Sequence, residues 1–245
     1  MTDIKRKVLF AICFIAICTA AVGQNENSKV TDFIEAVLKG YSTQTGGYLF
    51  HYSYSNESTP TEILDSITVE TVIKGVKYYC KAANTEIFCS DSGTTVLYHD
   101  EKIMYLSKSK PVKTNNPIQL LDSLMKMKAA EVNIQESGNE KSLVIAFPHL
   151  STYKEIIINF DTETNSISSM QYLVKTAELT ETDDGIANND YDEYAYVRID
   201  VERLNTFDSN VLNFSPLDFY KKEGQKVVAS GKYKDYHIYL GSINF

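Results

Sequence analysis

The sequence contains no tryptophan and only four histidines among its 245 residues. No histidine lies near another histidine or a cysteine in a metal-ligand spacing such as His-x-x-x-His, so no metal site is predicted. A Gly-x-Ser-x-Gly nucleophile turn, a phosphate-binding glycine loop and a zinc-protease helix are also absent. We therefore expect no enzymatic activity and no cofactor. The alternative, an enzyme of unusual type, would require at least two histidines to converge with carboxylates in a cleft, from the set His51, His99, His149 and His237.

Basic side chains are fewer than acidic ones, 24 against 32, which gives a formal net charge of −8. A field of this sign disfavours nucleic acid and anionic membrane surfaces as partners. Acidic residues gather between Asp183 and Glu193. Clustered oxygen ligands suit calcium, but the spacing is not that of an EF-hand loop, and a solvated acidic loop is the interpretation that we prefer.

The longest apolar run is short and lies near the start of the chain. Lys5-Arg6-Lys7 precede the apolar residues Val8 to Val22, and Ala21-Val22-Gly23 is a small-x-small site. This order is typical of a secretory signal peptide, which we assign to residues 1–23 with cleavage near Gly23/Gln24. The run is too short for a confident membrane span, so an uncleaved anchor is the alternative. Without the leader the net charge is about −10.

Cysteine is scarce, and two of the four cysteines, Cys13 and Cys18, lie in the leader. Each follows an isoleucine instead of the small residue that a bacterial lipoprotein needs, so we expect an exported protein without lipid or stable membrane anchor. Only Cys80 and Cys89 are left. A hairpin turn centred between residues 84 and 85 would set them directly opposite each other, within bridging distance. Export to an oxidising space permits a disulfide, which we predict; two buried thiols are the alternative.

Alternating apolar residues predict that most of the chain is β-strand. The central stretch, Lys74 to Ser107, is predicted to form two successive hairpins, the second with a turn at His99–Lys102. Helices are expected at Val30–Leu38 and Pro117–Lys128, with a short helical turn at Leu217–Lys222 closed by Gly224. Further strands are predicted at 48–54, 63–74, 132–135, 143–147, 155–160, 167–175 and 195–202, and one or two within 226–245.

About ten or eleven mostly antiparallel strands with few helices predict a mainly β fold. The expected form is a strongly curved antiparallel sheet, or unclosed β-barrel, covered by helices. No linker separates two domains, so we expect one domain over residues 24–245, with the strands from about 225 to 245 as a C-terminal extension.

Two stretches carry side chains suited to an apolar ligand. The strand from Tyr48 to Tyr54 has an aromatic face, and the helix Pro117–Lys128 has a broad apolar surface that would form an adaptable lid. The alternative for the tyrosines is an ordinary half-buried sheet. The candidate cavity residues are Tyr48, Phe50, Tyr52, Leu121, Leu124 and Met125.

The order of these pieces resembles the periplasmic outer-membrane lipoprotein carrier family, known as LolA-like. The matching segments are the helix Val30–Leu38, the strand ending in Ile73-Lys74, the run Ser90–Tyr98, the helix start Asn116–Leu121, and the hairpin Ile156–Phe160 with Ile167–Met170. The resemblance implies an N-terminal helix and an unclosed barrel whose helices close over an apolar cavity. It also implies a periplasmic location. Lys74-Gly75 stands where the family has Arg-Pro, whose arginine is tied to lipoprotein release.

These observations lead to two hypotheses for function. The first is an exported carrier that holds an acyl chain or another apolar ligand, with lipid or lipoprotein acyl chains as partners and trafficking to the outer membrane as the implied role. The second is a non-enzymatic interaction module of the cell envelope with a filled core, which contacts envelope proteins through its edge strands or acidic loop.

Overall fold

The computed structural model of the protein describes residues 45–75, 77–108, 131–148, 151–164, 166–179, 191–224 and 226–241. The predicted leader, the two predicted helices Val30–Leu38 and Pro117–Lys128, and residues 180–190 of the acidic segment lie outside them. No helix within the described ranges has the length and apolarity needed to cross a membrane.

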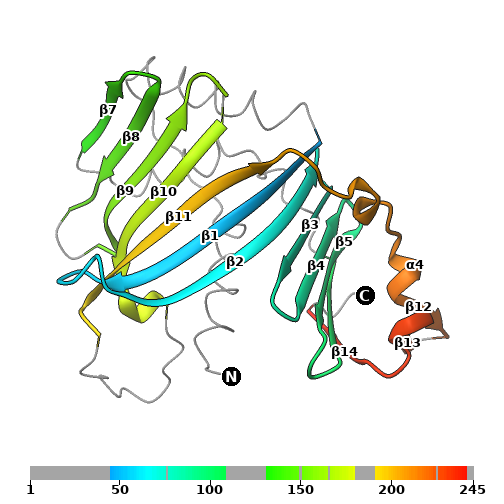
Figure 1. Cartoon of the computed structure of the whole chain (residues 1–245). Coiled ribbons are helices and arrows are strands. Elements are labelled where there is room, and N and C mark those ends of the chain that lie inside the picture. Colours follow the sequence, from blue (N-terminus) through cyan, green and yellow to red (C-terminus); the bar gives the residue numbers. More distant parts are fainter. Residues whose placement is uncertain are drawn as a thin grey trace. The chain divides into compact units, whose positions relative to one another are not determined.

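Strands dominate the described chain (Figure 1). Twelve of them form one sheet in the hydrogen-bonded order β14-β6-β5-β4-β3-β2-β1-β11-β10-β9-β8-β7, and β12 pairs with β13. The order is linear, with β14 and β7 at its ends, so the predicted mainly β, unclosed sheet is confirmed. The strands are β1 (Gly46–Asn56), β2 (Ile63–Lys74), β3 (Lys77–Ala82), β4 (Thr85–Ser90), β5 (Gly93–Tyr98), β6 (Ile103–Ser107), β7 (Glu131–Ser137), β8 (Glu140–Ala146), β9 (Tyr153–Asp161), β10 (Ser166–Lys175), β11 (Tyr194–Leu204), β12 (Tyr220–Glu223), β13 (Lys226–Ala229) and β14 (His237–Leu240).

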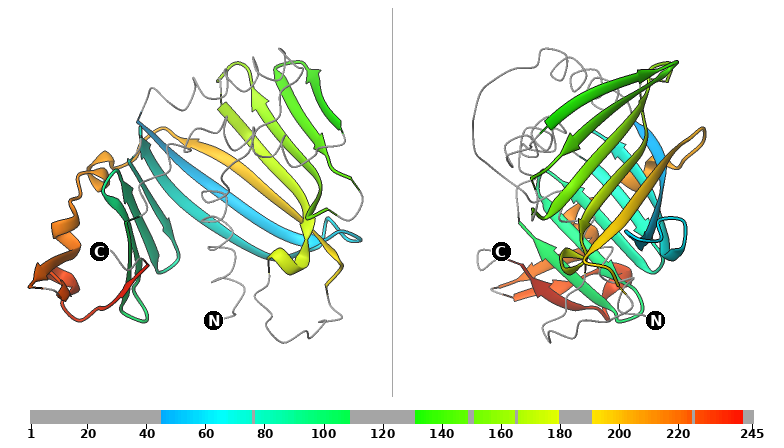
Figure 2. Two further views of the ribbon diagram at one scale, coloured as in Figure 1. Left: turned by 180° about the vertical axis from the view of Figure 1, so that it is seen from behind. Right: turned by 90° about the vertical axis from the view of Figure 1, so that its left-hand side faces the viewer.

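The chain divides into two compact units. We call the described residues of 50–68 and 131–202 the aliphatic unit, and those of 45–49, 69–108 and 203–241 the meander unit. Strands β1, β2 and β11 contribute residues to both units. Figure 2 shows the strands of each unit from two further sides.

Consecutive hairpins build the meander unit from β3 to β6. In the hairpin β5–β6, Leu97 pairs with Met104 and Tyr98 with Ile103, as predicted. The predicted register of the first hairpin is wrong, because Ala82 pairs with Thr85 across a two-residue turn. The turn is centred one residue earlier than predicted, between residues 83 and 84, and it sets Lys81 opposite Glu86, a favourable cross-strand pair of opposite charges.

This register also overturns the predicted disulfide between Cys80 and Cys89. Cys80 pairs with Ile87 and Cys89 with Tyr78, so the two cysteines share a face but stand diagonally, two residues apart along the ladder. Diagonal neighbours lie about 7–8 Å apart, beyond the usual span of a disulfide. Both thiols are free and buried. Each sulfur accepts a hydrogen bond from a threonine hydroxyl at 3.4 Å, Cys80 from Thr71 and Cys89 from Thr94.

The C-terminal segment of the meander unit returns to the hairpins. Ser215 caps the helix α4 (Pro216–Phe219), where its side chain accepts from the backbone N–H of Leu217. The predicted helical turn to Lys222 is too long, since residues from Tyr220 onward form β12. β14 then pairs in parallel with β6, whereas the other strand pairs whose register is described are antiparallel. The remaining described elements are the 3-10 helices η1 (Thr176–Glu178), η2 (Ser209–Leu212) and η3 (Gly231–Tyr233).

This segment covers one face of the hairpins with an aromatic core. Phe88 of β4 lies 4.8 Å from Phe219 and 5.3 Å from Phe214, measured between ring centroids. Phe219 in turn stacks on Tyr233 at 5.7 Å. The aromatic core, which we define as Phe88, Phe214, Phe219, Tyr233 and Tyr236, packs against Leu97, Met104 and Leu106, all fully buried.

The strands of the aliphatic unit have two contrasting faces. Register sets Ile145 against Ile156 and Leu143 against Ile158. We call this side the aliphatic face; its buried members are Leu143, Ile145, Phe147, Ile156, Ile158 and Phe160, and the half-buried residues at its border are Val132, Ile134, Tyr153, Ile167, Met170 and Tyr172. The opposite side is mixed, because Ser142 donates to Asn159 and Asn159 donates to Ser169, both at 2.8 Å, whereas Val144 pairs with Ile157 on the same side.

Candidate ligand-binding site

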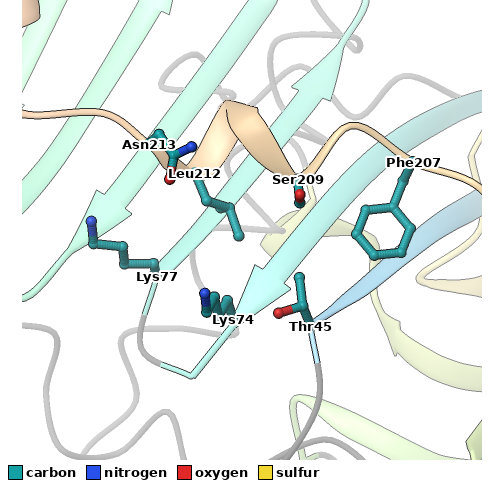
Figure 3. A pocket seen from close by; sticks show the side chains of 7 residues that line it. All are labelled: Thr45, Lys74, Lys77, Phe207, Ser209, Leu212 and Asn213. Atoms are coloured by element: carbon teal, nitrogen blue, oxygen red, sulfur yellow. The ribbon is translucent and has the colours of Figure 1, made fainter.

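The end of the β2–β3 hairpin forms one wall of a hollow in the meander unit. β2 ends at Lys74 and β3 begins at Lys77, and these residues make the last cross-strand pair. Gly75 follows with a φ of +59°, a left-handed conformation that glycine adopts without strain. The hollow has a volume of about 640 Å³, within the range of small-molecule sites. We call it the hairpin pocket; its lining residues are Thr45, Lys74, Lys77, Phe207, Ser209, Leu212 and Asn213 (Figure 3).

Among the described residues that line the hairpin pocket there are two positive charges and no carboxylate. In the part of the chain that the structure describes, no acidic side chain forms an ion pair with Lys74 or Lys77. The Lys77 ammonium lies 5.3 Å from the centroid of the Phe214 ring, a cation–π contact that leaves its N–H groups available. The pocket is therefore a positive spot on a protein whose formal net charge is −8.

The rest of the lining divides into polar and apolar groups. Thr45, Ser209 and Asn213 bring hydroxyl and amide donors. Phe207 and Leu212 form the apolar part, and Leu212 is buried against Val72 and Tyr79. The Phe207 ring packs closely against Gly47, because a Cβ added at Gly47 would lie 2.5 Å from the ring carbon Cγ. The pocket therefore combines cations, neutral donors and a small apolar wall.

The predicted cavity residues that the structure describes are not among those that line this pocket. Tyr48 is buried in the meander unit, where burial raises the pKa of its hydroxyl. Phe50 and Tyr52 belong to the aliphatic unit, where they are half-buried with ring centroids 6.4 Å apart. None of the three lines the hairpin pocket. The other three candidates, Leu121, Leu124 and Met125, lie outside the described residues.

Sequence reasoning missed the seven pocket residues. The local signal was the run Lys74-Gly75-Val76-Lys77 between two predicted strands, which places two like charges at one hairpin end. The residues from 207 to 213 carry no periodic pattern, and tertiary packing alone brings them to this hairpin.

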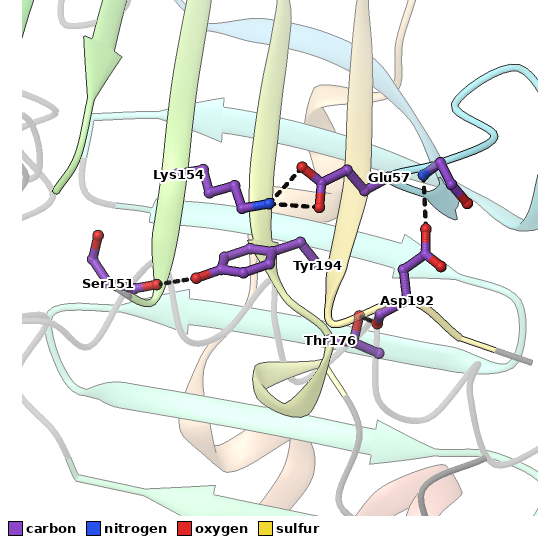
Figure 4. A network of polar contacts seen from close by, with 7 residues as sticks. Glu57, Ser151, Lys154, Thr176, Asp192 and Tyr194 are labelled. Atoms are coloured by element: carbon purple, nitrogen blue, oxygen red, sulfur yellow. Dashed lines mark hydrogen bonds and ion pairs between the residues drawn. The ribbon is translucent and has the colours of Figure 1, made fainter. Parts of the chain in front are cut away.

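A polar network in the aliphatic unit joins the loop after β1 to the start of β11 (Figure 4). The Lys154 ammonium donates to both carboxylate oxygens of Glu57 at 2.6 Å and lies 4.1 Å above the Tyr194 ring. The backbone N–H of Ser58 donates to Asp192 at 2.7 Å, and the hydrogen bonds from Ser58 lower the pKa of that carboxyl. These groups satisfy one another, so we assign the network a structural role.

A second cluster of titratable groups lies in the meander unit. One carboxylate oxygen of Glu86 accepts from the Tyr79 hydroxyl at 3.0 Å, and the other lies 3.1 Å from Nε2 of His99. The second ring nitrogen of His99, Nδ1, is 2.6 Å from the Tyr236 hydroxyl. Burial, followed by the charge of Glu86, raises the pKa of Tyr79. We call these four residues the Glu86 cluster.

The other predicted histidines are placed separately. His51 bonds to Thr68 and lies 3.7 Å from Glu202 in the aliphatic unit, whereas His237 is on β14 and His149 lies outside the described residues. Among the described residues, no group of three or more His, Cys, Asp or Glu side chains is arranged to hold a metal ion.

No family model and no curated protein matches the amino-acid sequence. Solved structures that are similar include a LolA superfamily protein from Nitrosomonas europaea, with 9% identity, coverage of 74% of this chain and 96% of that chain, and a TM-score of 0.33. The lipoprotein LppX from Mycobacterium tuberculosis has 6% identity, coverage of 75% and 99%, and a TM-score of 0.40. The MucA/MucB complex from Pseudomonas aeruginosa has 8% identity, coverage of 77% and 62%, and a TM-score of 0.39. A LolA superfamily protein is thus among the solved structures that are similar to this chain.

Proposed function

We propose that the protein is an exported, non-enzymatic carrier that binds an acyl chain or another apolar ligand in the cell envelope. The observation that carries this proposal is the aliphatic face. One side of strands β7 to β10 presents aliphatic and aromatic groups, and the opposite side presents the ladder Ser142–Asn159–Ser169. An acyl chain needs a surface of this kind, which offers dispersion contacts.

The border of the aliphatic face supports the same proposal. Val132, Ile134 and Met170 pack against its buried members but are themselves half-buried. Met170 is flexible and polarizable, which suits a ligand without fixed shape. The hydroxyl of Tyr172 donates to the Met170 sulfur at 3.5 Å, so the polar tip of this tyrosine also has a partner at the border.

Native mass spectrometry of the protein purified without detergent from an exporting host tests the proposal. We expect adducts of lipid mass that are lost on delipidation, and binding of a fluorescent undecanoyl probe by the delipidated protein. V132K would place a charge at the border of the aliphatic face and lower probe affinity at least tenfold. N133K on the same strand adds the same charge on the opposite face and serves as the matched control. A bare mass with no probe binding, or equal binding by the two variants, would contradict a carrier function.

A second candidate function rests on the outer edge of β14. Within the described chain, β14 ends the strand order and pairs with β6 on one side alone. His237 and Gly241 donate to carbonyls on the side of β6, so the intervening N–H groups of Ile238 and Leu240 point to the open edge. Tyr239 and Leu240 are exposed there. We infer that this edge suits an added strand from an envelope protein.

Capture of envelope proteins on immobilised protein tests the second candidate. L240P would remove the outward N–H and block an added strand. Leu217→Ser on α4, at a position that is 72% exposed against 46% for Leu240, is the control. We expect L240P to lose a partner that Leu217→Ser retains. Retention of the same partner by both variants would remove the edge of β14 from consideration.

A further inference from the structure

We propose that the hairpin pocket is a binding site for the anionic head of a single-chain amphiphile, a carboxylate or a phosphate ester attached to an apolar chain. This inference rests on the proposed carrier function and names the chemical class of its ligand. Lys74 and Lys77 bind the head, and the apolar wall of Phe207 and Leu212 contacts the first carbons of the chain.

Lys74 and Lys77 place two positive charges at one end of a hairpin. They are directly opposite each other at the end of the β2–β3 ladder, a position where like charges destabilise a hairpin. No carboxylate in the described chain offsets either charge. An anion between the two ammonium groups replaces their repulsion by two charge-assisted hydrogen bonds.

Neutral donors complete the head site. The hydroxyls of Thr45 and Ser209 make no hydrogen bond with another described residue, and both line the pocket. The Asn213 amide uses one N–H at 3.3 Å on the side chain of Asn210, which leaves its second N–H available. Carboxylate and phosphate oxygens can accept several bonds at once, so this set of donors fits them better than a neutral hydroxyl head.

The apolar wall explains why the anion carries a chain. Phe207 is held in place by the backbone of Gly47, and Leu212 is anchored in the cluster with Val72 and Tyr79. Both side chains are therefore fixed walls of the pocket. A free inorganic ion would leave the half-buried ring of Phe207 in contact with water, whereas the first methylene groups of an acyl or alkyl chain would cover it.

Calorimetric titration of the delipidated protein tests this assignment with four probes: dodecanoate, dodecyl phosphate, neutral dodecyl maltoside and inorganic phosphate. We expect dodecanoate or dodecyl phosphate to bind at least tenfold more tightly than the maltoside, and the preference between the two identifies the source of the anion. K74Q/K77Q should weaken the preferred anion roughly 10- to 100-fold, the loss of two charge-assisted contacts, and leave the maltoside unchanged. K222Q/K226Q, which removes two charges from the β12–β13 hairpin of the same unit, should change neither.

The possible failures are distinguishable. If no chain-bearing probe binds, both the carrier function and the head site fail. If the anionic and neutral probes bind with equal affinity, or if K74Q/K77Q binds the preferred anion as tightly as its control does, the head site is overturned while the carrier function is still supported. Inorganic phosphate binding as tightly as dodecyl phosphate would overturn the role of the apolar wall. A test without variants uses the parent chain. The bound anion should protect Lys74 and Lys77 from chemical acetylation, read by mass spectrometry, and a lack of protection would overturn the head site.

Discussion

The two units bury their sheets with different side chains. The aliphatic unit uses β-branched and aliphatic residues such as Leu143, Ile145 and Ile156 on one face of its strands. The meander unit uses rings, and the chain itself supplies their cover from α4, β13 and η3. Phe219 and Tyr233 are buried, and the ring centroids of neighbouring members lie 4.8–6.1 Å apart, so this aromatic core is closely packed. The difference shows that the two units bury their sheets with different kinds of side chain, and the proposed carrier function rests on the aliphatic kind.

The largest effect is expected at the centre of the aromatic core. F219A removes a ring that is 3% exposed and in contact with three other rings. We expect a loss of about 3–5 kcal/mol in the free energy of unfolding, from lost burial and the cavity left behind. Denaturant unfolding followed by tyrosine fluorescence measures it, and F219L should lose much less. A loss below about 1 kcal/mol for F219A would mean that the core is not closely packed as described.

I145A gives the corresponding test in the aliphatic unit. Ile145 is fully buried, and we expect a loss of about 2–5 kcal/mol against about 0.5–1.5 kcal/mol for I145V. If the aliphatic face holds an apolar chain, a saturating undecanoyl probe will stabilise the parent protein more than I145A. Equal stabilisation of the two would separate this face from ligand binding.

The Glu86 cluster is the polar counterpart within the meander unit. E86A leaves the Tyr79 hydroxyl and the His99 ring nitrogen without their acceptor, and we expect a loss of about 1–3 kcal/mol. Y79F removes one donor together with its need for an acceptor, so its loss should be smaller. A larger loss for Y79F than for E86A, in the same denaturant experiment, would contradict the described bonds.

The smallest effect is expected in the polar network of the aliphatic unit and depends on pH. Hydrogen bonds from Ser58 lower the pKa of Asp192 in the folded protein. A depressed pKa contributes stability above the unfolded value of about 4, and that contribution is lost as the pH falls through the folded pKa. D192N should therefore flatten the acid side of the stability profile below about pH 4. An unchanged acid slope, with E140Q as the control for an exposed carboxyl, would remove Asp192 from the pH response.

Much of the strand pattern was predictable from alternation. The predicted strand Ile63 to Lys74 coincides with β2, and the alternation from Ala195 to Glu202 falls within β11. These segments place apolar side chains on one face at a period of two, which local sequence records directly. The start of α4 was also predictable, because Ser215 and Pro216 act within four residues of each other.

Register and long-range contacts were not predictable in the same way. A shift of two residues in the β3–β4 hairpin keeps every side chain on its face, so alternation alone allowed both the predicted and the observed pairing of Cys80. The parallel pairing of β14 with β6 and the approach of Leu212 to Lys74 and Lys77 join segments that share no local pattern. The hairpin pocket depends on such contacts, which is why sequence reasoning identified Lys74 as a departure from a family pattern and not as part of a site.

The parallel strand β14 also affects the order in which the chain can fold. Lys102 at the β5–β6 turn forms an ion pair with Asp235, which lies 133 residues later in the sequence. β14 is the neighbour of β6 in the sheet and pairs with it in parallel. Ribosomal synthesis and export both deliver the hairpins long before this strand. The meander unit therefore cannot complete its folding, and the outer edge of β6 stays unpaired, until Tyr233 and β14 have been synthesised and exported. Closing so long a loop is slow, so the unpaired edge of β6 can pair with other strands during this interval.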